Sequence, residues 1–335
     1  MTKAPASAPL ALTMGDPAGV GPELAARLWQ DRDKLALPPF VFIGAPEALT
    51  AALPDVPYQV LDDVSEAAEV FAKAIPVLAV PVPAPVVAGE GNPANGSAVI
   101  NAIDKAVELA RAGAVSAIVT APLHKALLYQ AGFTAPGHTE YLARLCDLPD
   151  DASVMMLATE GLRVVPVTIH IALKDVAKKL TADAIIHAGR ATAADLRDRF
   201  GIKTPRLAVA ALNPHAGESG AMGMEEATHI QPAIWALKDD GIDVTGPLPA
   251  DTLFHADARQ NYDAVLCMYH DQALIPLKTL DFWGGVNITL GLPIIRTSPD
   301  HGTAFDLAGK GIARTDSMLA AIRMAAEMAT TEEQA

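Results

Sequence analysis

The chain has 335 residues, of which 51% are hydrophobic and only 5% aromatic, so aliphatic side chains must build its interior. This balance favours layered α/β packing over an aromatic-rich β-sandwich. The formal net charge of -14 argues against a general affinity for nucleic acid or an anionic membrane, and an anionic substrate would need a local cluster of cationic groups.

Along the chain, short apolar runs alternate with amphipathic ones, which is the pattern of a largely parallel sheet covered by helices. The predicted strands are Leu10–Met14, Phe40–Ile43, Ala117–Thr120, Val164–Ile169, Leu207–Leu212 and Ala264–Met268. The predicted helices are Ser97–Ala112 with Ser97 as N-cap, Glu225–Leu237, and Ser317–Met328 with Thr315 or Asp316 as N-cap. Val77–Gly96 is rich in Pro, Ala and Gly and predicts an irregular connection or an edge strand.

The order of these elements predicts two lobes, with the chemistry in a cleft between them. The chain is expected to cross to the second lobe near Thr134 and to return near Pro293. The first domain then comprises residues 1–134 and 294–335, and the second comprises residues 135–293 with most of the candidate site residues.

The two cysteines, Cys146 and Cys267, are too few for a disulfide framework or a thiolate zinc site, so reduced thiols are expected. The apolar run Pro9–Met14 is too short for a signal peptide. No stretch reaches the roughly 18 apolar residues that a membrane span needs. We therefore expect a soluble, cytoplasmic protein.

Three histidines lie at or just beyond the ends of predicted strands. His170, His215 and His270 end the runs RVVPVTIH, LAVAALNPH and YDAVLCMYH. In an open parallel sheet, the carboxyl ends of the strands form the edge where ligands bind. Three imidazoles at that edge are suited to hold a divalent metal with open positions for a substrate. For each histidine taken alone, a hydrogen-bonded structural role is the alternative.

Carboxylate and amide side chains stand beside these histidines. Asp271 directly follows the third histidine, and Asn213 and Glu218 flank the second, so acceptors that orient an imidazole are at hand. Ordinary turn or cap roles are the alternative for Asp271 and Glu218. Asp251, in PLPADTLFH, is a further acceptor candidate, although its position favours an N-cap.

The run Gly137-His138-Thr139-Glu140 precedes an apolar helical stretch and predicts a helix N-terminus. The free N–H groups and the positive dipole end of a helix favour an anion there. His138 is suited to contact a phosphate or a reacting hydroxyl, whereas Thr139 and Glu140 are also explained as cap residues alone.

The stretch Gln272–Pro299 carries few charges, but Lys278 and Arg296 are among them, with Asn287 between. An acidic protein that handles phosphate or carboxylate must place cations in its site, and Arg binds such groups in a bidentate manner. The alternatives are an exposed Lys278 and an Arg296 that is paired with a structural partner.

The loop Met14–Glu23 follows the first strand and leads into a helix with Pro22 near its first turn. Its glycines are spaced G-x-x-x-G-x-G, which is neither the Rossmann fingerprint nor the P-loop pattern. A tight backbone turn and a loop that lines the cleft both agree with this spacing. Any NAD would therefore not be bound in the Rossmann manner.

A series of motifs occurs in order between about residue 10 and about residue 328: MGDPAGVGPE, NPANGSA, TAPLHK, PGHTEYLA, TIHIALKDV, LNPHAGESGAMGMEE, GPLPADTLF, MYHDQALIPLK and GVNITLGLPIIRTSPDHGTAFDLAGKG. Together they resemble the 4-hydroxythreonine-4-phosphate dehydrogenase (PdxA) family of pyridoxal phosphate biosynthesis. MYHDQ and SPDHGTAFDLAGKG are too specific for chance similarity. One departure is His124 in TAPLHK, where the family pattern predicts Asn.

The resemblance implies two-domain α/β/α subunits, related in fold to isocitrate and isopropylmalate dehydrogenases, in a homodimer with its active site at the subunit interface. It implies that His170, His215 and His270 bind a divalent metal, with His270 donated across the interface. Ligation by imidazoles alone favours Zn2+, with Mg2+ and Co2+ as alternatives. The residues that it places around the substrate are His138, Thr139, Lys278, Asn287 and Arg296.

The implied reaction is NAD-dependent oxidation of 4-phosphooxy-L-threonine to 2-amino-3-oxo-4-phosphooxybutanoate, followed by decarboxylation to 3-amino-2-oxopropyl phosphate. The metal would lower the pKa of the substrate hydroxyl while hydride leaves the same carbon for NAD+. His138 and Lys278 are the candidate catalytic residues, and a metal-bound water is a third candidate base. The absence of an extra Arg cluster for a 2′-phosphate favours NAD over NADP.

Three alternatives stay open on the sequence. Dehydrogenases of 4-phospho-threonate or 4-phospho-erythronate in sugar-acid catabolism, and of dihydrodiols, share most of these motifs, and a fold does not settle a substrate. A phosphate acyltransferase has a similar fold but needs neither metal nor nicotinamide, so the three histidines oppose it. A non-catalytic metal- or metabolite-binding protein would not need the combined His, Lys and Arg side chains.

Overall fold

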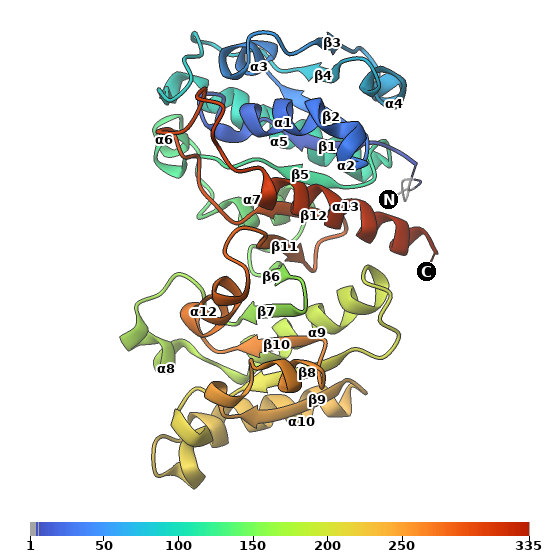
Figure 1. Ribbon diagram of the computed structural model, residues 1–335. Helices are drawn as coiled ribbons and strands as arrows, with labels where there is room; N and C mark the ends of the chain where they lie inside the picture. Colours follow the sequence, from blue (N-terminus) through green and yellow to red (C-terminus); the bar gives the residue numbers. More distant parts are fainter. Residues whose placement is uncertain (1–4, 6, 335) are drawn as a thin grey trace. The chain divides into compact units, whose positions relative to one another are not determined.

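The computed structural model describes residue 5 and residues 7–334 of the chain, which form two compact units (Figure 1). Unit 1 comprises the chain up to Ser153 together with Leu292–Gln334, and unit 2 comprises Val154–Gly291. The ends of the predicted first domain, residues 1–4, 6 and 335, lie outside the described residues. Over the part of the chain that is described, no helix is both long and apolar enough to cross a membrane.

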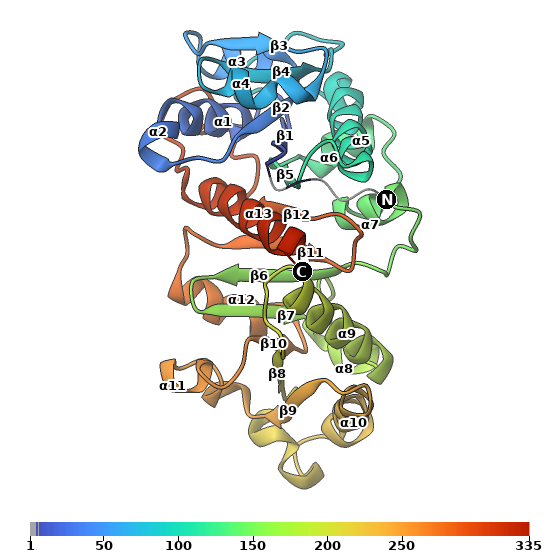
Figure 2. The ribbon, with the colours of Figure 1, turned by 90° about the vertical axis from the view of Figure 1, so that its right-hand side faces the viewer.

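Unit 1 is built on a parallel β-sheet. Its strands are β1 Leu10–Thr13, β2 Phe40–Gly44, β3 Tyr58–Val60, β4 Ile75–Ala79, β5 Ile118–Thr120 and β12 Arg296–Pro299, in the order β3-β4-β2-β1-β5-β12. Its helices are α1 Val20–Gln30, α2 Arg32–Leu35, α3 Pro46–Ala52, α4 Ala67–Phe71, α5 Gly96–Ala112, α6 Lys125–Gln130, α7 His138–Leu145 and α13 Asp316–Gln334, with short 3-10 turns at η1 Val64–Glu66 and η2 Pro93–Asn95. Figure 2 shows α5 on one face of this sheet and α1 and α13 on the other, which explains why β1 and β2 are buried and apolar along their whole length.

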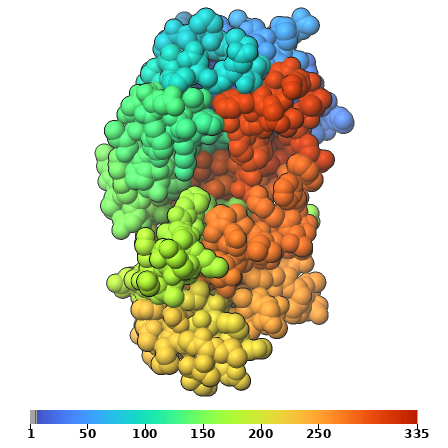
Figure 3. Space-filling model, turned by 90° about the vertical axis from the view of Figure 1, so that its left-hand side faces the viewer, coloured from blue at the N-terminus to red at the C-terminus, as the bar shows by residue number. Residues whose placement is uncertain are grey.

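The C-terminal part of unit 1 packs against its N-terminal part. A Cβ at Gly91 would meet the ring of Phe305 at 2.8 Å, and Thr297 Oγ1 of β12 donates to the Ala321 carbonyl of α13 at 2.9 Å. Figure 3 shows the red C-terminal residues beside the cyan residues of the same unit. Unit 1 is therefore continuous in space although it is discontinuous in sequence.

The first boundary between the units differs from the predicted one. Residues 135–153 belong to unit 1, whereas the sequence analysis assigns them to the second domain. Helix α7 packs on α5, where Tyr141 Oη donates to Asp104 and Arg111 donates to the Leu145 carbonyl at 2.6 Å. Such long-range contacts leave no local sequence pattern, so tertiary packing decides to which unit this segment belongs.

Unit 2 is built on a mixed sheet with helices on both faces. Its strands are β6 Val154–Thr159, β7 Leu162–Pro166, β8 Arg206–Ala210, β9 Asp243–Leu248, β10 Ala264–Cys267 and β11 Val286–Leu290, in the order β11-β6-β7-β10-β8-β9. Its helices are α8 Val176–Lys179, α9 Ala182–Asp198, α10 Gln231–Asp239, α11 Ala256–Arg259 and α12 His270–Leu280, with short turns at η3 Leu173–Asp175, η4 Pro214–Gly220, η5 Glu226–Ile230 and η6 Ala250–Thr252. The pairs β11-β6 and β6-β7 are antiparallel, and β7, β10, β8 and β9 run parallel. Figure 2 shows α12 on one face and α9 and α10 on the other.

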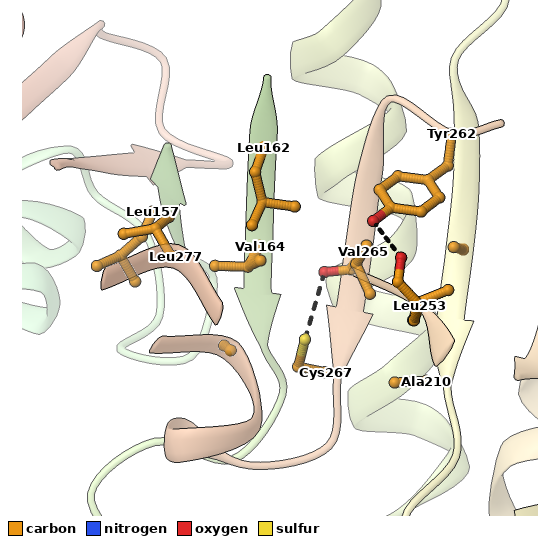
Figure 4. Close-up of a cluster of buried hydrophobic side chains, with 11 residues drawn as sticks. Leu157, Leu162, Val164, Ala210, Leu253, Tyr262, Val265, Cys267 and Leu277 are labelled. Carbon is orange, nitrogen blue, oxygen red and sulfur yellow. Dashed lines mark hydrogen bonds between the residues drawn. The ribbon is translucent and has the colours of Figure 1, made fainter. Parts of the chain in front are cut away.

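The core of unit 2 lies between these parallel strands and α12 (Figure 4). Val164 and Val265 of the strands and Leu277 of α12 are fully buried in it. Tyr262 is also buried, and its Oη donates to the Leu253 carbonyl at 2.8 Å. Cys267 packs in the same cluster as a free thiol whose pKa burial raises well above its usual range. Both cysteines of the chain are free and buried, which confirms the expectation of unbridged thiols.

The predicted strands are all confirmed, with ends shifted by a few residues, because long apolar runs between turn signals are a strong local pattern. The predicted irregular segment 77–96 begins with the end of β4, which is an internal strand, and then continues as an irregular connection. The last predicted helix is confirmed as α13, which begins at Asp316.

Two helix starts differ from the prediction. Ser97 is not an N-cap: the turn η2 runs directly into α5, and the side chain of Asn92 caps that turn by accepting from Ala94 N at 3.0 Å. The predicted helix Glu225–Leu237 begins as a π-turn over Glu226–Ile230 before α10. Pro232 explains the irregularity, because its ring supplies no N–H to the α-helical ladder.

Candidate active site

The three histidines lie beyond neighbouring parallel strands of unit 2. Strands β7, β10 and β8 are adjacent in that order and parallel, so their carboxyl ends form one edge. His170 and His215 lie in the loops beyond β7 and β8, and His270 is the first residue of α12 beyond β10. This confirms the predicted placement at the edge where parallel sheets bind ligands.

His170 and His270 adjoin because the backbones before them stay paired beyond the strands. Val167 N donates to the Cys267 carbonyl at 2.7 Å, and the buried Thr168 donates its Oγ1 to the Met268 carbonyl at 2.6 Å. The ring centroids of the two histidines are 5.8 Å apart. They line a pocket of about 300 Å³ whose walls are Ile169, His170, Ile171, Leu173, Val176, Tyr269, His270 and Asp271.

The neighbour of His270 orients its imidazole for metal binding. Nδ1 of His270 lies 2.7 Å from Oδ1 of Asp271. An ionised carboxylate only accepts hydrogen bonds, so Nδ1 carries the proton and Nε2 keeps its lone pair. A carboxylate behind a ligating imidazole is the usual outer partner of a metal site, and the donor set therefore fits a divalent cation.

His215 does not join this pair within the single chain. Among the described residues, no three His, Cys, Asp or Glu side chains come close enough together to hold one ion. Side chains of His170 and His215 are exposed and that of His270 is half-buried. The chain alone thus brings together two of the three predicted ligands.

His215 begins a run of left-handed backbone. The residues His215–Ser219 have φ values between 43° and 75°, and only Gly217 among them is a glycine. For other residues this conformation costs roughly 1–2 kcal/mol each, and such strain persists only where surrounding contacts hold it. Glu218, a predicted acceptor, lies exposed in this same turn.

Gln272 is a site residue that the sequence analysis missed. Its buried side chain accepts from Met268 N at 2.6 Å and donates to the Ala211 carbonyl at 2.7 Å. The amide thus joins the end of β10, before His270, to the end of β8, before His215. Its position next to the HD pair in MYHDQ was the available signal, but only the buried bridge shows its role.

In unit 1, a buried arginine contacts His138. Arg296, at the start of β12, is 5% exposed and donates Nε and Nη2 to Thr120 Oγ1 of β5 at 3.0 and 2.6 Å. Its Nη2 also lies 3.3 Å from Nδ1 of His138. Burial lowers the pKa of Arg296 to about 10, which leaves it charged at neutral pH. Thr120 was not predicted as a site residue, because nothing local marks its contact with a residue 176 positions away.

The contact with Arg296 fixes the tautomer of His138. A guanidinium only donates, so Nδ1 of His138 must accept, and the proton of the neutral ring then lies on Nε2. Nε2 is buried and has no hydrogen-bond partner among the described residues. Burial, reinforced by the charges of Arg296 and Lys125, holds the pKa of His138 well below its usual range. The ring is therefore a neutral donor that a bound oxygen atom can satisfy.

This low pKa predicts that acid destabilises the protein through His138. In the unfolded chain the ring has its ordinary pKa of 6.5, whereas in the folded chain the pKa is lower. Below pH 6.5 the unfolded state therefore binds more protons, and the free energy of unfolding falls as the pH drops. Urea unfolding of the wild type and of His138→Gln at about pH 7.5 and about pH 5.5 is expected to show a smaller loss in the variant. Equal losses in the two proteins would contradict the prediction.

The remaining predicted substrate residues lie on regular elements. Thr139 is half-buried in the first turn of α7, as predicted, and the helix is preceded by Gly137. Lys278 is half-buried on α12, with Nζ 5.3 Å from the centroid of the Phe282 ring. Asn287 is half-buried on β11, paired with Leu157 of β6.

The opening loop makes a tight turn against the loop after β5. Gly15 has φ 66°, and a Cβ there would lie 2.3 Å from the Pro122 carbonyl oxygen, so only glycine fits. Asp16 is buried, and burial raises the pKa of its carboxyl. The nearby His124, where Asn was expected, has its ring centroid 5.4 Å from that of Phe305. Its Nδ1 is buried and has no hydrogen-bond partner in the part of the chain that the structure describes.

Two of the other acceptor candidates have different roles from those expected. Asp251 is exposed within η6 and is not its N-cap residue. Pro249 occupies the N-cap position of this turn. The Nδ2 of Asn213 donates to Glu225 and Glu226 at 2.7 and 2.9 Å, so its side chain also holds the turn beside His215. Asp271 contacts a histidine, as predicted.

Comparison with known proteins relates almost the whole chain to one family. The family model described as pyridoxal phosphate biosynthetic protein PdxA matches residues 36–325. A 4-hydroxythreonine-4-phosphate dehydrogenase from Caulobacter vibrioides is 56% identical over 327 residues, which cover 96% of this chain and 98% of the relative.

Solved structures give the same relation. The crystal structure of 4-hydroxythreonine-4-phosphate dehydrogenase from Klebsiella pneumoniae is 41% identical, with a TM-score of 0.86 over 96% of this chain and 99% of that one. An isocitrate dehydrogenase from Methylococcus capsulatus is 14% identical, with a TM-score of 0.50 over 97% and 87% of the two chains, a likeness of fold alone. The predicted α/β fold class, like that of isocitrate dehydrogenase, is confirmed.

Proposed function

The chain belongs to the PdxA family of pyridoxal phosphate biosynthetic proteins, and on this premise we propose that it is a 4-hydroxythreonine-4-phosphate dehydrogenase. The proposed reaction oxidises 4-phosphooxy-L-threonine with NAD+ to 2-amino-3-oxo-4-phosphooxybutanoate, which loses CO2 to give 3-amino-2-oxopropyl phosphate. The observation that carries the proposal is 56% identity, over nearly all of both chains, to a relative that bears this name.

We propose that His170, His215 and His270 hold the divalent metal, which polarises the substrate hydroxyl when it is bound. The imidazole donors favour Zn2+ over Mg2+, and Co2+ is a ready substitute. The Asp271 carboxylate behind the His270 imidazole supports this assignment. Leu173 and Tyr269 also line the pocket beside the two imidazoles.

Among the described residues, the three imidazoles do not come together within one chain, and a homodimer supplies a route. We propose that the active site lies at the interface of two subunits, as the family resemblance implies, so that His270 of one chain joins His170 and His215 of the other. Unit 2 exposes the large apolar side chains that a dimer would bury, and those near α12 are Leu173, Ile275, Leu280, Phe282 and Trp283.

In unit 1, Arg296 and His138 are suited to bind an anionic group of the substrate. The buried guanidinium attracts a phosphate or carboxylate. The free N–H groups at the start of α7 also favour an anion. Nε2–H of His138 can donate to a substrate oxygen, and Thr139 offers its hydroxyl one residue further along. In unit 2, Lys278 and Asn287 add a cation and an amide to the proposed substrate set.

The tautomer of His138 bears on the proton transfer. A ring whose Nδ1 accepts from Arg296 and whose Nε2 carries the proton has no free lone pair for the hydroxyl proton. We therefore assign His138 to binding and hydrogen-bond donation. Of the two candidate catalytic residues, Lys278 remains as the proton acceptor. The cofactor supplies the hydride acceptor.

NADH formation tests the proposed function directly. Purified full-length protein with NAD+, Zn2+ and 4-phosphooxy-L-threonine is expected to form NADH in a reaction that a chelator stops. 4-Phospho-threonate serves as the matched substrate, because a hydroxyl group replaces the amino group in its acid portion. Turnover of phospho-threonate alone would move the protein to sugar-acid catabolism, and no NADH from either compound would refute the dehydrogenase assignment.

A further inference from the structure

A buried carboxylate braces the chain just before His215. Glu226 is 6% exposed at the start of η5, and its Oε1 accepts from the backbone N–H groups of Leu212 and Asn213 at 2.9 and 2.7 Å. Its Oε2 accepts from Asn213 Nδ2 at 2.9 Å. These contacts satisfy the two amides that leave β8, and they fix the direction in which the chain enters the left-handed turn.

The same carboxylate also touches the chain just after His215. A Cβ added to Gly217, which has φ 75°, would lie 2.6 Å from Glu226 Oε2. Only a glycine therefore allows the carboxylate to lie against the turn at this point. Glu226 thus binds the backbone two residues before His215 and leaves no room for a Cβ two residues after it.

The neighbouring Glu225 makes fewer hydrogen bonds to the residues around the turn. Its Oε2 accepts from the side-chain Nδ2 of Asn213 at 2.7 Å, and no hydrogen bond to the backbone of the turn is seen among the described residues. Glu225 is half-buried, whereas Glu226 is buried. The two adjacent carboxylates therefore form a natural pair of test and control positions, with the same charge and the same length.

We propose that Glu226 is a positioning residue that holds the turn His215–Ser219 in its left-handed conformation and so presents His215 to a divalent metal. The inference rests on the proposed function, because it takes His215 as a metal ligand. Without the brace, the non-glycine residues of the turn are free to leave their strained conformation. The imidazole then loses its fixed position, and the metal is held less tightly.

The test is a metal titration of the full-length apo-protein. Zn2+ is titrated into wild type, Glu226→Gln and Glu225→Gln in competition with a chromophoric chelator, and the visible spectrum of each Co2+-loaded protein is recorded. Gln at position 226 replaces one acceptor oxygen by an NH2 group that faces the donor Nδ2 of Asn213. Outer partners of metal ligands contribute about 10–100-fold to metal affinity. We therefore expect Glu226→Gln to lose about 10–100-fold in Zn2+ affinity and to show an altered Co2+ spectrum. Glu225→Gln is expected to keep the wild-type affinity and spectrum.

Thermal unfolding of the metal-free proteins separates positioning from general stability. The proposal expects the apo-forms to unfold at similar temperatures and excess Zn2+ to restore turnover of Glu226→Gln. Gly217→Ala, which crowds the carboxylate without changing any charge, is expected to weaken Zn2+ binding as well. Wild-type affinity in folded Glu226→Gln, or in Gly217→Ala if the first variant does not fold, overturns the proposal. Wild-type affinity in His215→Ala would instead refute the metal site on which it rests.

Discussion

His215→Ala is expected to lower kcat/KM for 4-phosphooxy-L-threonine on the order of 10³-fold, because the metal contributes several kcal/mol to the reaction. His215 is exposed beyond β8 and is part of no described core cluster, so its imidazole matters little for the fold. The metal-free variant is therefore expected to unfold at nearly the wild-type temperature. Metal content after dialysis, steady-state NADH formation and thermal unfolding together check the prediction.

Two further variants make the His215 experiment specific. His215→Asn removes the imidazole but keeps a side chain that tolerates left-handed backbone, so its loss of activity cannot be ascribed to strain at φ 52°. His229→Ala removes a half-buried histidine from the adjacent turn η5 and is expected to keep full activity. Retained turnover in metal-stripped His215→Ala protein would remove the metal from the mechanism.

Arg296→Ala is expected to lower kcat/KM about 10²-fold or more, with much of the change in KM. The variant leaves the bound anionic group of the substrate without its buried cation. Removing one partner of such a charge pair costs about 2–5 kcal/mol, and each 1.36 kcal/mol changes kcat/KM by a factor of about ten. Arg296→Lys keeps the charge but loses the planar fork that reaches both Thr120 and His138, so an intermediate loss is expected. Steady-state kinetics and inhibition by inorganic phosphate measure the effect.

The exposed Arg323 is the matched control for Arg296. It donates to the Leu35 carbonyl at 2.8 Å, and Arg323→Ala is expected to leave the kinetic constants unchanged. Arg296→Ala has a second expected consequence, because the guanidinium helps to keep the pKa of His138 low. The His138 ring should titrate closer to its usual pKa in that variant, which an NMR titration can follow. Wild-type kinetics in Arg296→Ala would show that the anion is bound elsewhere.

The resemblance and the strand pattern together located most of the candidate site. His170, His215 and His270 could be placed at one sheet edge because each ends an apolar run, and parallel strands share their carboxyl edge. The start of α7 at His138 was also predictable, since an apolar helical stretch follows Gly137. These are local patterns of a few residues, which is why the sequence carries them.

The residues that orient the site could not be found in this way. Gln272, Glu226 and Thr120 are buried polar residues with distant hydrogen-bond partners. Gln272 bonds to a residue 61 positions away, Glu226 to one 14 positions away, and Thr120 to one 176 positions away. Their meaning depends on which strands are neighbours, and no periodicity of the chain records that. The left-handed turn after Pro214 was likewise not visible, because only Gly217 and Gly220 hint at positive φ.

The sequence by itself determined the α/β class, the strands, the family and the histidines at the strand ends. The spacing of apolar residues and the short motifs are local properties of the chain, and the sequence therefore carries them. Only the tertiary structure decided that residues 135–153 belong to unit 1 and that His170 adjoins His270. It also decided the tautomer of His138, which follows from a donor 158 positions away. Each of these depends on contacts between distant segments, and burial, not local pattern, selects which of those contacts form.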